Sequence, residues 1–249
     1  MLRTIHNPLR LAVCLLLAAA GAEAGTLSII DHSRWVAVSH IYDGDTFRTD
    51  KGEKVRLLGI NTPEMPYNDQ PGQILAEQAK QRLTELISGK LVRLSMDAEK
   101  RDSYGRTLAQ IYLRNGTWIN AQMVGEGLAF VYTFAPNFRW VSELQQAERV
   151  ARDKQLGIWN TERFRVLDGK SVSKRLAGQF RVLKGTVSAA RAWGFRIDKL
   201  AVSVPRKYRR WFKNEAIAHN EEQVIIRGTL RLAGNGQLYM ALHSPADLE

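Results

Sequence analysis

The sequence predicts an α+β protein in which strands form a small antiparallel sheet or barrel, followed by a second, smaller β-rich domain. In the first part, short runs of Val, Ile and aromatic residues come first, and helical patterns are interleaved with later runs and follow them. Beyond about residue 178, strand patterns dominate again. We therefore expect a first domain at 25–165, a linker at 166–178 and a second domain at 179–249.

Strands of the first domain are expected where β-branched and aromatic residues gather between turn signals. These segments are 35–42, 46–49, 54–60, 91–97 and 107–113. Helices are expected at 71–88, 118–126 and 139–155. In the first helix, Pro71 suits the first turn and Gly89 can end the helix, while Leu75, Ala79 and Leu83 fall on one face.

The second domain is expected to be a small β-barrel of OB-like type. Its strand patterns lie at 180–188, 194–204, 223–232 and 237–242, and Gly234-Asn235-Gly236 supplies a turn before the last. A basic stretch at 206–219 reads as helical, and its Arg206–Trp211 part mixes cations with aromatic rings. That mixture is typical of nucleic-acid-binding surfaces, but it also fits a solvated helix face with Trp211 and Phe212 buried.

Residues 1–24 have the three parts of a signal peptide. Arg3 and Arg10 precede an apolar run at 11–20, and Ala22-Glu23-Ala24 forms a cleavage site. The apolar run is short for a membrane span, so we expect export to the periplasm or the medium without stable membrane insertion. An uncleaved N-terminal anchor is the alternative. Cleavage would remove Cys14 and leave no cysteine, which excludes disulfides, thiol catalysis and cysteine-bound zinc.

The chain is strongly basic. Its formal charge is +11, and removal of the first 24 residues, which carry two arginines and one glutamate, leaves +10. A basic exported protein is attracted to polyanions such as nucleic acid, anionic lipid or cell-wall polymers. Charge alone does not choose among them.

Three short motifs indicate a site that holds phosphate and a metal together. Arg56 has apolar neighbours, as on a buried strand, yet its guanidinium keeps its charge and needs an anion, for which Glu64 is the nearest candidate in sequence. Asp43-Gly-Asp45-Thr46 precedes this stretch, and Asp102-Ser-Tyr-Gly-Arg106 follows it. Each motif alone can be structural: a turn, an Arg56–Glu64 ion pair, or a loop entering a strand.

With a closing Leu156-Gly-Ile-Trp159, these motifs occur in the same order as in the thermonuclease, or staphylococcal-nuclease-like, family, which the segment 35–159 resembles. Four motifs in order favour the functional interpretation. The resemblance implies a five-stranded OB-fold β-barrel with three helices. It also implies a calcium-dependent phosphodiesterase that cleaves DNA and RNA and leaves 3′-phosphate ends.

The resemblance assigns roles residue by residue. Arg56 and Arg106 match the arginines that bind the scissile phosphate, and Glu64 matches the residue that orients or deprotonates the attacking water. Asp45, Asn61 and Thr62 match the calcium ligands, the last through its backbone carbonyl. Asn61 stands where the family commonly has aspartate, so one negative charge is missing and we expect weaker calcium binding.

Aromatic residues match the nucleotide-binding positions of the family. Tyr104 and Tyr132 match tyrosines that flank the bound nucleotide, and Phe134 stands where a second stacking tyrosine is usual. Phe130 is expected to pack in the core, whereas for Phe134 core packing and stacking are both open. Protein partners are not indicated.

The leading hypothesis is therefore a secreted, calcium-dependent nuclease. One alternative is a non-catalytic nucleic-acid-binding protein of the cell envelope with a weakened metal site, and another is an envelope protein that binds anionic polymers. The sequence has no H-E-x-x-H motif, phosphate loop or G-x-S-x-G nucleophile motif, which argues against the corresponding enzyme classes.

Overall fold

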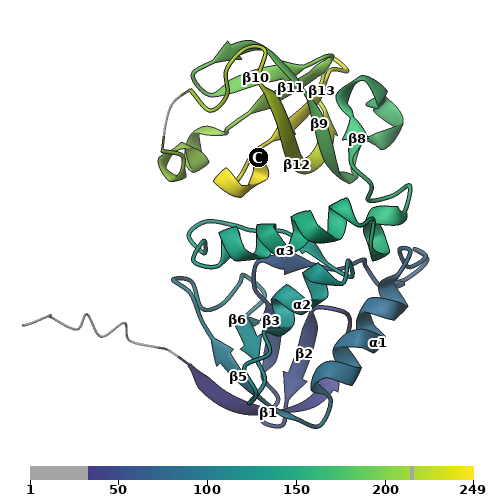
Figure 1. Cartoon of the computed structure of the whole chain (residues 1–249), viewed down its shortest axis with the longest axis vertical. Helices are drawn as coiled ribbons and strands as arrows, with labels where there is room; N and C mark the ends of the chain where they lie inside the picture. The colour runs from purple at the N-terminus through teal and green to yellow at the C-terminus, as the bar shows by residue number, and fades with distance from the viewer. Residues whose placement is uncertain (1–32, 214–215) are drawn as a thin grey trace, which may run out of the picture. The chain divides into compact units, whose positions relative to one another are not determined.

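The computed structural model describes residues 33–213 and 216–249 (Figure 1). The predicted signal peptide at 1–24 lies outside the described residues. In the first part of the described chain, strands close a barrel in the order β1-β2-β3-β6-β5, with β3 and β6 parallel and the other pairs antiparallel. The strands are β1 (Arg34–Ile41), β2 (Thr46–Thr49), β3 (Lys54–Leu57), β5 (Leu91–Ser95) and β6 (Thr107–Tyr112).

Three α-helices lie near the predicted positions: α1 (Ala76–Ile87), α2 (Ile119–Gly125) and α3 (Val141–Asp153). Helix α1 begins five residues later than predicted, so Pro71 is not in its first turn. Leu75, directly before the helix, has a positive φ of 68°, and the Gln73 N–H donates to the Glu64 carbonyl at 2.8 Å. The segment before α1 is therefore tied to the loop that contains Glu64.

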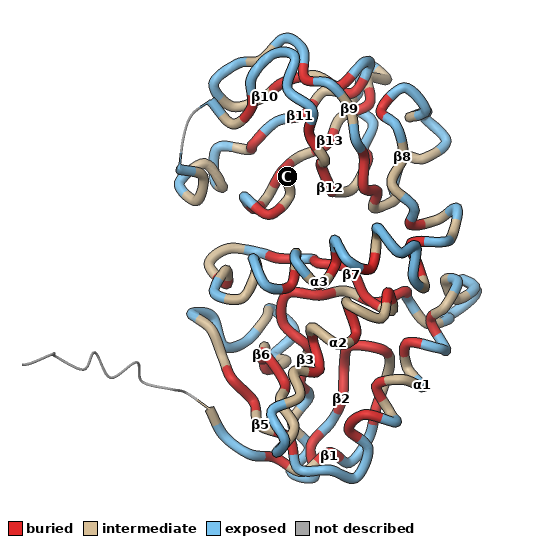
Figure 2. Tube along the Cα trace, in the orientation of Figure 1, coloured by how far each residue is buried: buried red, intermediate tan, exposed pale blue. Residues whose placement is uncertain are grey.

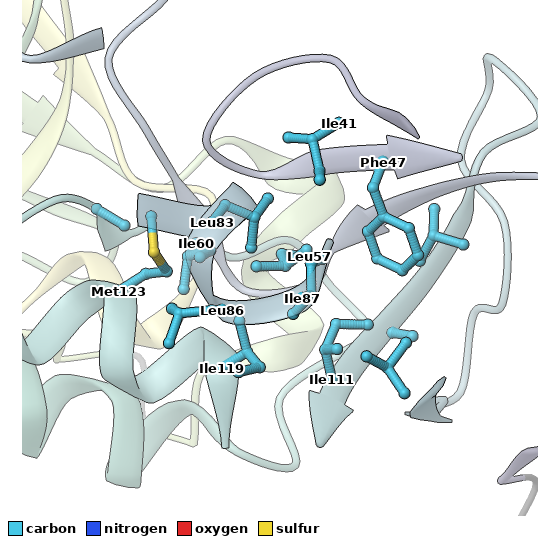
Figure 3. Close-up of a cluster of buried hydrophobic side chains, with 14 of the residues drawn as sticks. Ile41, Phe47, Leu57, Ile60, Leu83, Leu86, Ile87, Ile111, Ile119 and Met123 are labelled. Atoms are coloured by element: carbon cyan, nitrogen blue, oxygen red, sulfur yellow. The ribbon is translucent and has the colours of Figure 1, made fainter. Parts of the chain in front are cut away.

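The core of the first barrel is formed by alternating strand residues and one face of each helix. Buried and exposed residues are interspersed along the strands (Figure 2), as expected for a barrel with a packed interior and a solvent-facing outer side. Figure 3 shows Leu83 and Ile87 of α1 beside Leu57 of β3 and Ile60, and these four side chains have 1% exposure or less. The helical face predicted from the spacing of the leucines is the buried face.

The predicted strand at 54–60 is wrong as a single element. Strand β3 ends at Leu57, and after a turn through Gly59 the chain forms β4 (Ile60–Asn61), which pairs with β7 (Phe130–Val131). The Leu58 N–H still donates to Ala109 on β6, and the Tyr132 N–H donates to the Gly59 carbonyl. This break turns the segment after Gly59 out of the barrel wall and fixes it beside residues 130–132.

A second small barrel follows, as predicted. Its strands run in the order β10-β11-β13-β12-β9, β10 also pairs with β9, and β8 is added outside β9. They are β8 (Leu167–Asp168), β9 (Phe180–Arg191), β10 (Gly194–Ile197), β11 (Leu200–Ser203), β12 (Gln223–Leu232) and β13 (Leu238–Ala241). The α+β fold class, with two barrels, is confirmed.

Three local predictions in this part need correction. The expected strand 194–204 is a hairpin, since β10 and β11 pair around a turn in which Asp198 has a φ of 48°. Within the described residues of 206–219, the helical part is a 3₁₀ turn, η4 (Arg206–Trp211). The expected linker contains β8, which pairs in parallel with β9. The domain limits 25–165 and 179–249 stay a prediction, because contacts group residues 32–249 in one unit.

Buried contacts join the two barrels. Phe130 and Trp159, the latter in η1 (Gly157–Asn160), form an apolar cluster with Val182 of β9, and the Glu148 carboxylate on α3 meets Arg227 on β12. In the same region Gly127 and Gly157 pass each other so closely that a Cβ on either would overlap a backbone carbonyl of the other segment. The Ile158 N–H donates to the Gly127 carbonyl at 2.8 Å.

Among the described residues, no helix is both long and apolar enough to cross a membrane.

Candidate active site

A cavity of about 760 Å³ opens at one end of the first barrel. It is formed by the loops that follow β1 and β3, by the segment before β6, and by residues after β7. All nine predicted site residues line it: Asp45, Arg56, Asn61, Thr62, Glu64, Tyr104, Arg106, Tyr132 and Phe134. The fold thus brings together residues that are up to about 90 positions apart in the chain.

Asp45 is a buried carboxylate, with 5% of the residue exposed. Its Oδ2 accepts hydrogen bonds from the Thr62 N–H at 2.9 Å and from the Thr62 hydroxyl at 3.0 Å, and its Oδ1 accepts from the Thr46 hydroxyl. A Cβ at Gly44 would lie 2.7 Å from the Ala79 Cβ, so glycine lets this loop approach α1 and Thr62 closely. Asp45 is therefore held in one orientation toward the cavity.

The anion beside Arg56 is Asp45 rather than Glu64. Arg56 Nη2 lies 3.0 Å from Asp45 Oδ2 and donates to Asn61 Oδ1 at 2.6 Å, while Nη1 donates to the Leu57 carbonyl at 2.8 Å. Its side chain is 12% exposed. A guanidinium fixed at both terminal nitrogens has little rotamer freedom left to lose when a ligand arrives.

Asn61 connects Arg56 with the following loop. Its Nδ2 donates to the Thr62 carbonyl at 3.1 Å and makes a long contact of 3.4 Å with Glu64 Oε1. Glu64 itself is exposed. Its carboxylate therefore borders the cavity where water has access to it.

Arg106 is positioned by the turn that precedes it. Asp102 Oδ1 accepts from the backbone N–H groups of Tyr104 and Arg106, and Asp102 Oδ2 accepts from Arg106 Nε at 2.7 Å. Burial raises the pKa of Asp102, but the bonds from Arg106 outweigh it, so the pKa lies below its usual range. The carboxylate is charged at neutral pH and directs Arg106 toward the cavity.

Asp43 is a further cavity residue, which belongs to one of the predicted motifs but had no predicted role of its own. Its Oδ1 accepts the Asp45 N–H at 3.0 Å, and burial together with the nearby Asp45 charge raises its pKa to about 6. The signal was present in the sequence, because both aspartates flank Gly44. A turn accounts for Asp43, whose carboxylate accepts the Asp45 N–H, but not for the buried Asp45.

The aromatic residues divide into cavity wall and core. Tyr104 is 84% exposed, and Tyr132 and Phe134 are 36% and 44% exposed with ring centroids 4.8 Å apart. Phe130 is 3% exposed and its ring stacks on Phe180, so its predicted core position is confirmed. Phe134 keeps an open face beside the cavity.

The predicted ligands fit a hard cation by donor type. Asp45 offers a carboxylate, Asn61 an amide oxygen and Thr62 a carbonyl, which are oxygen donors that calcium accepts. Within the described residues, no cluster of three or more His, Cys, Asp or Glu side chains is arranged for a metal. The Asn61 oxygen and the Thr62 carbonyl also accept hydrogen bonds, from Arg56 and from the Asn61 amide. A cation at these atoms therefore competes with those two hydrogen bonds.

Comparison with known proteins identifies the family. Residues 54–161 match the model of the staphylococcal nuclease homologue family. A thermonuclease of Staphylococcus intermedius is 37% identical over 125 residues, covering 49% of this chain and 74% of the relative. A thermonuclease of Staphylococcus hyicus is 32% identical over 126 residues, covering 49% and 74%. Endonuclease YncB of Bacillus subtilis (strain 168) is 32% identical over 130 residues, covering 50% and 61%. The chain therefore belongs to the staphylococcal nuclease family and is a nuclease of that family.

Proposed function

We propose that this chain is an exported, calcium-dependent nuclease that hydrolyses phosphodiester bonds of DNA and RNA and leaves 3′-phosphate ends. The observation that carries the proposal is that Arg56 and Arg106 line one cavity with the carboxylates of Asp45 and Glu64. Two planar cations suit the non-bridging oxygens of a phosphodiester, and the acids supply a metal ligand and a base.

Binding of the scissile phosphate falls to the two arginines. The Leu57 carbonyl and Asn61 Oδ1 accept hydrogen bonds from the Arg56 guanidinium. The Asp102 carboxylate accepts hydrogen bonds from Arg106 Nε and from the Arg106 backbone N–H. Both guanidinium groups are thus oriented before substrate binds. Since negative charge gathers on the phosphoryl oxygens in the transition state, such preorganised donors stabilise it more than they stabilise the ground state.

Glu64 activates the attacking water. Its exposed carboxylate can accept a proton from a water molecule that approaches the phosphorus from the cavity. Attack by that water breaks the bond to the 5′ oxygen, which leaves with a proton from solvent. The phosphate then remains on the 3′ side.

Asp45, Asn61 and Thr62 would hold the calcium ion, which supplies positive charge next to the phosphate. Tyr132 and Phe134 present ring faces on which any base can stack, which supports the use of both DNA and RNA. Export rests on the sequence pattern of residues 1–24.

The test uses purified protein with single-stranded DNA and RNA, in calcium or in excess chelator. We expect calcium-dependent cleavage with 3′-phosphate ends, lost in both Arg56→Ala and Glu64→Ala. Binding without cleavage in calcium, magnesium or manganese would instead support the non-catalytic alternative, which the missing charge at Asn61 favours. Fractionation of the source cells would check export.

A further inference from the structure

Residues of the second barrel lie directly behind the cavity wall. The His243 ring stacks on Phe134 with centroids 6.3 Å apart and planes 25° apart, and the buried Ser244 and Thr133 hydroxyls lie 2.9 Å from each other. Phe134 lines the cavity. The second barrel is therefore in contact with the place where a nucleotide would stack.

Aromatic faces continue from the cavity onto the second barrel. Tyr132 meets Phe134, Phe134 meets His243, and His243 meets Tyr208 of η4 with centroids 4.8 Å apart. The Lys207 ammonium lies 4.7 Å from the centre of the Tyr208 ring. Phe134, His243 and Tyr208 are each at least partly exposed, so this succession of rings is accessible from solvent.

Positive charge accompanies these rings. Lys207 and Arg231 are exposed, and burial followed by the charges of Arg231 and Lys207 lowers the pKa of His243. The Lys207 ammonium lies over the Tyr208 ring, which contacts the His243 ring, and Arg231 is on β12 of the same barrel. The exposed parts of these rings, with cations beside them, suit a single strand, whose unpaired bases can contact the rings while its phosphates meet the cations.

Other parts of η4 serve the fold instead. The Trp211 ring packs edge-on against Phe138, and Arg209 lies over the Trp193 ring and donates to the Val204 carbonyl. The Trp211 contact holds η4 against the loop after Phe134, and the Arg209 contacts hold it against the second barrel. Lys207 is exposed, whereas Tyr208 packs partly against the core of the second barrel and keeps a part exposed next to His243.

We propose that Lys207, Tyr208, Arg231 and His243 form an exit strip that binds single-stranded nucleic acid where it leaves the cavity past Phe134. The proposal rests on the proposed nuclease function of the cavity, to which it adds a dependence on substrate length. A substrate of one nucleotide occupies the cavity alone, whereas a longer strand also reaches the exit strip. A duplex pairs its bases with each other and cannot use the ring faces.

The experiment compares Tyr208→Leu and Lys207→Ala/Arg231→Ala with the control Lys184→Ala/Lys199→Ala. The control removes the same number of charges from exposed positions of the second barrel. The dissociation constant of a single-stranded oligonucleotide of about a dozen nucleotides is measured by fluorescence anisotropy in chelator. In calcium, kcat and KM are measured for this oligonucleotide and for a nitrophenyl ester of a nucleoside phosphate.

We expect each exit-strip variant to weaken oligonucleotide binding by about tenfold, because one base stack or two phosphate contacts are lost. The small ester should keep its kcat and KM, the control should behave as wild type, and Tyr208→Phe should restore binding. The double charge variant should also lower the salt dependence of binding, by roughly 0.7 per phosphate contact in the logarithmic slope.

Unchanged oligonucleotide affinity in Tyr208→Leu would overturn the proposal, as would equal loss on both substrates. Equal affinity for a duplex of the same sequence would overturn its restriction to single strands. The binding measurement does not need catalysis. If no substrate is cleaved in the presence of any metal ion, the proposed nuclease function is wrong. The binding measurement in chelator still tests the exit strip in that case.

Discussion

Glu148 on α3 and Arg227 on β12 form a buried ion pair between the two barrels, with side chains 0% and 2% exposed. The other Glu148 oxygen accepts the backbone N–H of Val131 at 2.7 Å. Val131 belongs to β7, which pairs with β4 and so with Asn61. One carboxylate thus links the second barrel to the strand that supports the active-site loop.

Arg227→Met should destabilise the protein by about 3–5 kcal/mol, because it removes a partner of both Glu148 and Glu249 and leaves the buried Glu148 charge only Arg152, 3.9 Å away. Urea unfolding measures the change. The control Arg165→Ala removes half of an exposed pair with Glu162 and should cost about 1 kcal/mol or less. A loss from Arg227→Met as small as that of the control would show that the buried pair does not join the barrels energetically.

Arg56→Lys should lower kcat by on the order of a hundredfold. Lysine keeps the charge but cannot hold Asp45, Asn61 and the Leu57 carbonyl with a planar fork while facing the phosphate. Arg48→Ala, an exposed arginine on neighbouring β2, is the matched control and should retain its rate. Steady-state cleavage of an oligonucleotide gives both values. Equal values of kcat for Arg56→Lys and wild type would show that Arg56 does not bind the phosphate as proposed.

Asn61→Asp should tighten calcium binding by on the order of tenfold. The change adds a carboxylate and removes the amide hydrogen that occupies the Thr62 carbonyl. Titration calorimetry with calcium chloride measures the affinity without any substrate. Asp50→Asn, an exposed change outside the cavity lining, serves as the control. The same calcium affinity in Asn61→Asp and wild type would mean that position 61 is not a ligand.

Asp247 should make stability depend on pH in the direction opposite to most carboxylates. Burial raises its pKa to about 6, although its Oδ2 accepts from the His243 and Ser244 N–H groups. Because the folded state binds this proton more strongly than the unfolded state, the group destabilises the fold progressively between about pH 4 and 6. Above that window the loss reaches about 2–3 kcal/mol.

Asp247→Asn keeps an acceptor for both N–H groups and does not titrate. The variant should therefore gain stability relative to wild type when the pH is raised from 4.5 to 7.5. Urea unfolding at both values provides the comparison, and the exposed Asp50→Asn should show no such gain. If the difference between Asp247→Asn and wild type is the same at both pH values, Asp247 does not carry the raised pKa.

Local patterns were sufficient for most of the fold. The clusters of β-branched and aromatic residues predict the strands, and the helical spacing of Ala79 and Leu83 predicts α1, because burial of these apolar residues decides the structure. The motif residues of the cavity were found because they lie close in sequence to strand ends. The sequence did not reveal that Asp45 is the partner of Arg56, because the two residues come together only when β2 pairs with β3.

Other features depend on contacts that no local pattern contains. The split of 54–60 follows from pairing with β7, some seventy residues later in the chain. His243 meets Phe134 only after the second barrel has closed, so the sequence could assign the Arg206–Trp211 segment to binding or to packing but could not place it. In the structure Lys207 of this segment is exposed, whereas Trp211 packs against Phe138.

The crossing of Gly127 and Gly157 offers a way to sort divergent sequences of this family. A chain that keeps both glycines but lacks Arg56 and Arg106 can keep this backbone crossing although it has lost the two cations of the cavity. A chain with side chains at both crossing points must have rerouted its backbone, whatever its acids and arginines suggest. A sequence search that gives all motifs equal weight would not separate these two groups of relatives. A separate score for Gly127 and the Leu156-Gly-Ile-Trp159 motif would separate chains that keep the backbone crossing from chains that have lost it.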